Sequence, residues 1–206
     1  MKVFRQIAYL CVVAVVAMTT VSCSNENDAT LTQQQTSISR YLTSSHQPRL
    51  IAEADIASSL DNEPQFYSQW GLDIYRYIAT YYAEGRDDKA VVERGSQITI
   101  TYKAYLFTGS KPSVSNLYAT NSADAIAELQ AAGLNTEYEW TTDPMTVVMG
   151  REEIIPALET ALMDCREGDS VEIYLTYDAA YGKHYVGLVP SKSSVVWYID
   201  IVSVTK

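Results

Sequence analysis

The segment "QITITYKAYL", residues 97–106, constrains the fold of this chain more than any other feature of its sequence. Its side chains alternate, which gathers one set on a single face: Ile98, Ile100, Tyr102, Ala104 and Leu106. A period of two indicates a β-strand with its inner face in a core. The segment "SVVWYIDIVSV" repeats the pattern near the C-terminus with Val195, Trp197, Ile199 and Ile201. The chain must therefore build a sheet with a buried face.

Other segments predict the elements around these two strands. Three resemble strands: "GLDIYRYIATYY" (71–82), "MTVVMG" (145–150) and "VEIYLTY" (171–177). Amphipathic spacing predicts helices over 31–45 and 122–133. A third helix should begin at Pro156, because proline at the first helical position loses no hydrogen bond. Its apolar stripe is Leu158, Ala161, Leu162 and Cys165, and Gly168 should end it.

The order of these elements predicts the fold class. From residue 71 it runs strand, strand, helix, strand, helix, strand, loop, strand, without regular helical crossovers. This order favours an α+β fold, in which helices pack on one face of an antiparallel sheet. The inner faces already complete one core, so residues 71–206 are expected to fold without residues 24–64.

The N-terminus has the features of an export signal. Lys2 and Arg5 precede a mostly apolar run from Ile7 to Val21, which is shorter than the roughly 20 apolar residues that span a bilayer. The run ends at Ser22-Cys23, which resembles the lipobox of bacterial lipoproteins. We therefore expect a signal peptide over 1–22, a lipid on Cys23, a flexible tether over 23–30, a helical extension over 31–64 and the main domain over 65–206.

Composition and residue counts exclude several classes of protein. The net charge of −10 argues against a nucleic-acid partner, because such binding relies on clustered Lys and Arg. Cys165 would be the one cysteine left beside the lipidated Cys23, as a core residue without a disulfide. His46 and His184 have no partner at ligand spacing, so neither a metal nor another cofactor is predicted. The adjacent Glu152 and Glu153 precede the helix that should begin at Pro156. Acidic residues in this position more often stabilise the helix dipole than act as the two catalytic carboxylates of a glycosidase.

The loop "DAAYGKHYVGLVP", residues 178–190, is apolar for a connecting segment. Loops usually carry polar side chains, because their backbone groups must reach water. This one offers Tyr181, Tyr185, Leu188 and Val189. It is expected to cover an apolar pocket.

From about Gly71 to Val204 the chain resembles the FKBP-type peptidyl-prolyl isomerases. The matching marks, in order, are Arg94-Gly95 before a strand ending at Tyr102, "VVMGREEIIPALETAL", Gly168, "AAYG" followed by "LVP", and an aromatic residue in the last strand. The resemblance implies an FKBP-like bent antiparallel sheet wrapped around one main helix. Here a short helix is inserted between Leu106 and Asp143, and a helical extension precedes the domain.

The resemblance also implies a site. Carried over by position, the catalytic residues would be Tyr102, Ile155, Tyr181 and Trp197. The substrate contacts would be Tyr118, Met145, Ile154, Leu158, Tyr185, Leu188 and Val189. The sequence departs from the family at three positions: Met145 replaces an aromatic wall residue, Leu158 replaces a tryptophan floor, and Ala119 replaces the pocket aspartate.

An apolar cup of this kind could catalyse rotation about an X-Pro bond, which costs ~18–20 kcal/mol because amide resonance is lost. It would exclude water and bind the twisted amide more tightly than the planar one. The Tyr181 hydroxyl and the Ile155 N–H could donate to the substrate carbonyl.

Two functions stay open. The first is a prolyl isomerase or folding helper, tethered to a membrane of the bacterial cell envelope, that acts on proline-containing segments of exported client proteins. The alternative is an FKBP-like module that binds peptides or proteins without turnover. Ala119 and Leu158 favour the second function. The first is favoured by the retained residues Tyr102, Ile155, Tyr181 and Trp197.

Replacing Cys23 with alanine tests the anchor. We expect Cys23→Ala to move the protein from the membrane fraction to the soluble fraction, because the lipid would have no attachment site. Membrane partitioning that survives the substitution unchanged would contradict lipidation at this residue.

Overall fold

The computed structural model describes residues 28–206, so the predicted signal peptide (1–22) and Cys23 lie outside the described residues. The chain divides into two compact units, 1–33 and 34–206. The described part of the first unit, residues 28–33, is helical. Residues 28–30 were expected to belong to the flexible tether, and that expectation is wrong for them. Their composition is small and polar, which does not distinguish a linker from an exposed helical turn. No helix within residues 28–206 is long and apolar enough to cross a membrane.

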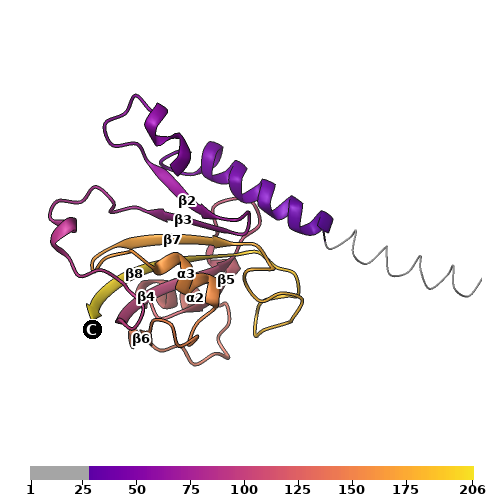
Figure 1. Ribbon diagram of the computed structural model, residues 1–206. Helices are drawn as coiled ribbons and strands as arrows, with labels where there is room; N and C mark the ends of the chain where they lie inside the picture. Colours follow the sequence, from indigo (N-terminus) through magenta and orange to yellow (C-terminus); the bar gives the residue numbers. More distant parts are fainter. Residues whose placement is uncertain (1–27) are drawn as a thin grey trace, which may run out of the picture. The chain divides into compact units, whose positions relative to one another are not determined.

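The second unit is built on one eight-stranded sheet. The strands are β1 (Ile51–Ala52), β2 (Phe66–Trp70), β3 (Ile74–Ile78), β4 (Gln97–Leu106), β5 (Leu117–Thr120), β6 (Met145–Val148), β7 (Ser170–Leu175) and β8 (Val195–Thr205). Their spatial order is β1-β2-β3-β7-β8-β4-β5, and β6 pairs with the first half of β4 (Figure 1). All neighbours are antiparallel except β1 and β2. The predicted α+β class is confirmed, whereas the sequence did not reveal β1, β2 or β5.

The helices also agree with the sequence pattern in most respects. The inserted helix is α2 (Ala123–Ala131), and the main helix is α3 (Pro156–Leu162), with proline at its start. In the second unit, α-helix over 34–40 continues as one π-helical turn, η1 (Tyr41–Ser45). Three 3-10 turns complete the unit: η2 (Glu53–Ser58), η3 (Arg86–Asp88) and η4 (Val114–Asn116).

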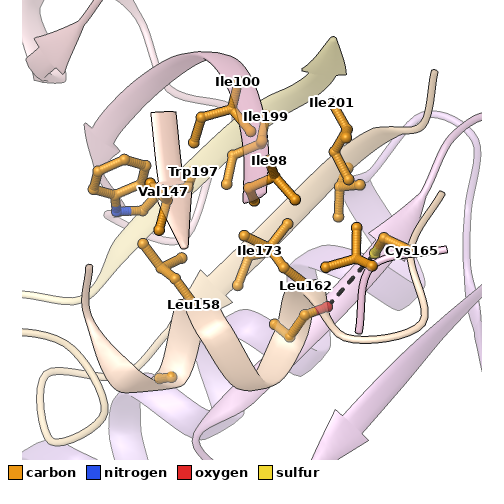
Figure 2. Close-up of a cluster of buried hydrophobic side chains, with 14 of the residues drawn as sticks. Ile98, Ile100, Val147, Leu158, Leu162, Cys165, Ile173, Trp197, Ile199 and Ile201 are labelled. Atoms are coloured by element: carbon orange, nitrogen blue, oxygen red, sulfur yellow. Dashed lines mark hydrogen bonds between the residues drawn. The ribbon is translucent and has the colours of Figure 1, made fainter. Parts of the chain in front are cut away.

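α3 ends earlier than its apolar stripe suggested. Its last residue is Leu162, so Cys165 lies in the turn that follows rather than on the helix. The side chain is nevertheless fully buried, with its Sγ 3.7 Å from the Ala161 carbonyl oxygen (Figure 2). Burial raises the pKa of the Cys165 thiol to about 11. The thiol is therefore protonated at neutral pH and has the character of a core residue.

The first core lies between α3 and one face of the sheet. Leu158 and Leu162 from α3 point toward the inner residues of the strands, among them Ile98, Ile173 and Trp197 (Figure 2). The residues predicted to face inward from β4, β7 and β8 are in this cluster, either buried or packed against it. Period-two alternation therefore identified this face correctly.

The second face of the sheet is also covered, so the prediction that helices pack on one face is wrong. Residues Ile38, Tyr41, Leu42 and Leu50 pack there against Tyr67, Tyr75, Tyr77, Phe107, Tyr174 and Val196. The tyrosines of β3 and β7 had looked like an outer face, because their hydroxyls make them amphipathic. Removing the N-terminal segment would expose this second core, which argues against the expectation that residues 71–206 fold alone.

A buried histidine joins the N-terminal segment to β7. His46 is 3% exposed, and its Nε2 lies 3.0 Å from Glu172 Oε2 while its Nδ1 contacts the Pro48 carbonyl oxygen. Both partners are acceptors, and an imidazole donates from both nitrogens only when protonated. Tyr174 donates to the same Glu172 oxygen at 2.6 Å.

The surroundings of His46 have opposing effects on its charge. Burial lowers the pKa of His46 and Lys111 adds repulsion, but the hydrogen bonds to Glu172 and Pro48 outweigh both effects. The pKa is therefore raised above its ordinary value. The rings of Tyr41 and Tyr77 pack edge-on against the imidazole at centroid distances of 5.6 and 5.2 Å.

We expect His46→Gln to lower the free energy of unfolding by about 1.5–3 kcal/mol, as for hydrogen bonds to charged groups. Because the folded pKa of His46 is raised, its contribution is fully present below the unfolded value of about 6.5 and is lost as pH rises through the folded value. The loss should be larger at about pH 5.5 than at about pH 8.5. Denaturant unfolding at the two pH values measures it. His184→Gln, at the exposed second histidine, is the matched control and should change little. A loss independent of pH would count against the charged pair.

Candidate functional site

The fold brings most of the predicted site residues together. Nine of the eleven lie in the first core or pack against it: Tyr102, Tyr118, Met145, Ile154, Ile155, Leu158, Tyr181, Val189 and Trp197. They come from β4, β5, β6, the start of α3, the loop between β7 and β8, and β8 itself. Segments separated by up to about a hundred residues therefore meet at one place.

The aromatic residues of this group are in direct contact. Tyr102 stacks on Trp197 with centroids 4.9 Å apart and an interplanar angle of 30°. Tyr118 meets Trp197 and Tyr181 edge-on at 6.2 and 6.0 Å. We call Tyr102, Tyr118, Tyr181 and Trp197 the aromatic cluster.

The pairing of β4 with β8 explains this arrangement. Ala104 lies directly opposite Trp197, and Tyr102 lies opposite Ile199. Tyr102 and Trp197 are therefore diagonal neighbours on one face, within reach of aromatic side chains. The small side chain of Ala104 leaves space for the indole.

Three hydrogen-bond donors at this place lack a strong acceptor. The indole Nε1 of Trp197 is buried without a partner among the described residues. The Ile155 N–H, at the N-cap of α3, donates to none of residues 28–206, as expected of a group just before a helix. The Tyr181 hydroxyl donates to the Tyr118 hydroxyl over a long 3.4 Å. A ligand carbonyl could accept from the Tyr181 hydroxyl or the Ile155 N–H, whereas the buried indole Nε1 could be reached only after a local movement.

These donors are neutral and stay so over a wide pH range. Burial raises the pKa of Tyr118 well above its ordinary value, and it also raises the pKa values of Tyr102 and Tyr181. Ala119, which packs against the same core cluster, provides no carboxylate. The hydroxyls therefore remain protonated below about pH 10.

Two departures from the sequence expectation concern the walls of the site. Leu158, expected to form a shallow floor, is 1% exposed and part of the core. Tyr185 is 73% exposed, Leu188 is half-buried, and neither packs against the core cluster. The bridge between Val186 and Val189, with Gly187 at a φ of 55°, turns the chain here and leaves Tyr185 outside. The assignment of Tyr185 and Leu188 as substrate contacts stays a prediction.

The two acidic residues before α3 have structural partners. The Glu153 carboxylate accepts from the Val148 N–H at 2.9 Å, and the Glu152 N–H donates to Glu159 at 3.0 Å. These bonds fix the turn that presents Ile154 and Ile155. The Glu153 carboxylate thus has a stabilising role, whereas the role of the Glu152 side chain stays a prediction.

Sequence reasoning missed one residue that holds the site loop. Gln34 donates from Nε2 to the Lys192 carbonyl and accepts from the Tyr177 N–H through Oε1, both at 2.8 Å. One amide group therefore joins the two ends of the loop that carries Tyr181 and Val189. Its neighbour Gln35 donates to Asp73 at 3.1 Å. A run of three glutamines carries no signal that could have indicated these partners.

A separate cavity of about 340 Å³ lies over β2 and β3, and none of the predicted site residues lines it.

The sequence of this chain also matches a known protein family. The family model of the FKBP-type peptidyl-prolyl cis-trans isomerases matches residues 88–202, more than half of the chain. The chain belongs to this family. The matched range contains every predicted site residue from Tyr102 to Trp197, whereas Gln34, His46 and strands β1–β3 precede it.

Among solved structures, the chain is similar to the three FKBP domains of wheat FKBP73. The two share 15% sequence identity with a TM-score of 0.49, over 69% of this chain and 51% of that chain. The chain thus spans about half the length of that structure. Comparison with curated proteins gave no match.

We expect Gln34→Ala to loosen the site loop, because it removes both hydrogen bonds. Amide hydrogen exchange of Tyr177 should accelerate by roughly five- to tenfold, equivalent to ~1–1.4 kcal/mol. Gln34→Glu keeps an acceptor for the Tyr177 N–H, so it should preserve this protection while repelling the Lys192 carbonyl. Gln33→Ala, at an exposed position, is the matched control. Unchanged exchange in Gln34→Ala would show that the loop is held by other contacts.

Proposed function

We propose that this protein is an exported, membrane-tethered peptidyl-prolyl isomerase or folding helper of the bacterial cell envelope. The observation that carries the catalytic part is that three donors without a strong acceptor lie in or beside the aromatic cluster. These donors are the Tyr181 hydroxyl, the Ile155 N–H and the Trp197 indole N–H. The family's isomerase domain provides the frame for this chemistry.

The residues would act on the amide in two ways. The aromatic and aliphatic side chains displace water from the planar, charge-separated amide and so disfavour it. The donors hold the carbonyl oxygen while the bond to proline twists, and catalysis requires that they bind the twisted form more tightly than the planar form. No covalent step and no charged group is needed. Activity should therefore vary little between about pH 5 and about pH 9.

Turnover is expected to be low. Ala119 provides no carboxylate beside the twisting amide, and the buried Leu158 provides no aromatic floor. The same two observations support the second candidate, an FKBP-like module that binds proline-containing segments without turnover.

The cellular part of the proposal rests on the N-terminal sequence. Its apolar run and Ser22-Cys23 support export and lipidation at Cys23. Proteins that share the envelope and expose X-Pro segments while folding are then the expected clients.

Refolding limited by proline isomerisation tests the activity, because that step takes tens of seconds and is easily followed. We expect the protein to accelerate it weakly. Tyr181→Phe should reduce the binding of a proline peptide by roughly 0.5–1.5 kcal/mol. Tyr138→Phe removes a hydroxyl at an exposed position outside the predicted site and should change little.

Ala119→Asp separates the two candidate functions. We expect it to raise the isomerase rate and to introduce a pH dependence in the acid range, since a carboxylate would join the site. Leu158→Trp is a poor partner for this test, because overpacking a fully buried position costs ~1–3 kcal/mol. A folded protein that binds proline peptides, yet accelerates refolding in neither form, is a binding module. If proline peptides do not bind at all, both candidates fail.

A further inference from the structure

The cavity over β2 and β3 lies almost entirely on residues that the family match does not include. Of its lining residues, all but Asp164 and Arg166 precede residue 88. Its volume of about 340 Å³ is at the lower end of the range of small-molecule sites, ~300–1,000 Å³. The cavity is therefore a feature of this chain rather than of the isomerase site.

Arg76 contributes a positively charged guanidinium group to the wall of this cavity. This side chain stands on β3 between Ile74 and Ile78, directly opposite Ser68 of β2. Its Nη1 donates to the carbonyl oxygens of Ala161 and Met163 at 2.9 and 2.7 Å. The end of α3 thereby fixes the guanidinium, whose Cζ lies 4.8 Å from the centroid of the Trp70 ring.

The other edge of this guanidinium is not used by the protein. The Nε of Arg76 is buried without an acceptor among the described residues. Its Nη2 has one long contact, 3.4 Å to the Ser68 hydroxyl. No carboxylate of residues 28–206 lies within ion-pair distance of it. The Nε and Nη2 atoms of this immobilised guanidinium thus have no strong hydrogen-bond acceptor among the described residues.

A second arginine beside the same cavity shows what such an edge binds. Arg86 donates from Nε and Nη2 to the two carboxylate oxygens of Asp169, both at 2.7 Å. Planar, two-pronged pairing of this kind is the preferred way in which guanidinium binds a carboxylate. In Arg76 the same pair of nitrogens has no carboxylate partner among residues 28–206.

The rest of the lining restricts the ligand further. Tyr81 and Tyr82 are 41% and 37% exposed at the cavity, and Tyr81 packs edge-on against Phe66. They provide an aromatic surface. Glu53, Asp87 and Asp164 are exposed lining residues and disfavour a dianion such as phosphate. One guanidinium edge matches the two oxygens of a single carboxylate.

We propose that this cavity binds a small ring-bearing monocarboxylate, with its carboxylate on the Nε–Nη2 edge of Arg76 and its ring against Tyr81 and Tyr82. The ligand replaces the long Ser68 contact and supplies the buried Nε–H with an acceptor. This site is independent of the proposed isomerase function, which uses the aromatic cluster.

Phenylacetate and its uncharged analogue phenylacetamide provide the matched probes, and inorganic phosphate provides a second anion. Side-chain NMR of the protein should show a saturable shift of the Arg76 Nε–H with phenylacetate, with a dissociation constant of about 1 mM or below. Phenylacetamide and phosphate should each bind at least about tenfold more weakly. Equal binding of the amide, or no saturable shift at the cavity residues, would overturn the proposal.

Variants locate the site. Arg76→Lys keeps the charge but loses the fork and should weaken phenylacetate binding by about tenfold or more. Arg49→Lys, at an exposed position outside the cavity, should bind like the parent protein. If Arg76→Lys does not fold, Tyr81→Ala tests the aromatic wall and should weaken binding several-fold. Binding that is unchanged in either folded variant places the ligand elsewhere and overturns the assignment.

Discussion

The pairing of β4 with β8 is the interaction on which the rest of this structure depends. Ten residues of β4 each have a partner on β8, and this ladder runs through the centre of the sheet. Its register sets Ala104 opposite Trp197 and so allows the indole to stack on Tyr102. A shift of one residue would turn every side chain to the opposite face. The core under α3 and the aromatic cluster therefore follow from one register.

Both faces of this sheet carry apolar side chains, so another part of the chain must pack against each face to bury them. α3 covers one face, and residues 38–50 cover the other, where tyrosines of β3 and β7 are buried. Polar contacts make the second cover specific: His46 reaches Glu172, and Gln34 reaches both ends of the site loop. The N-terminal segment of the second unit is thus connected to the loop that carries Tyr181. A segment outside the family match supports the geometry of the site within it.

The aromatic cluster lies within the range of the family match, and the cavity lies mostly outside it. The two sites also differ in their chemistry. Within the family match, the aromatic cluster offers neutral donors and no carboxylate, which suits an amide carbonyl. Outside it, β2 and β3 place Arg76 beside a polar cavity. Unsatisfied buried donors occur at both places, on Trp197 and Arg76. Such groups are costly to leave unpaired, so each indicates where an acceptor belongs.

The sequence by itself determined the inner faces of β4, β7 and β8, the start of α3 at Pro156, and the family. These features depend on local periodicity, on the fixed φ of proline and on ordered motifs, all of which are present before folding. Tertiary structure alone decided the cover of the second face, since the tyrosines of β3 and β7 fit water or a core equally well. It also decided the irregularity between Thr99 and Ile100, which lets both Ile201 and Val204 face inward against the period of two. Gln34 and His46 find partners 158 and 126 residues away. Contacts over such separations leave no periodic trace, because only the packed sheet brings those groups together.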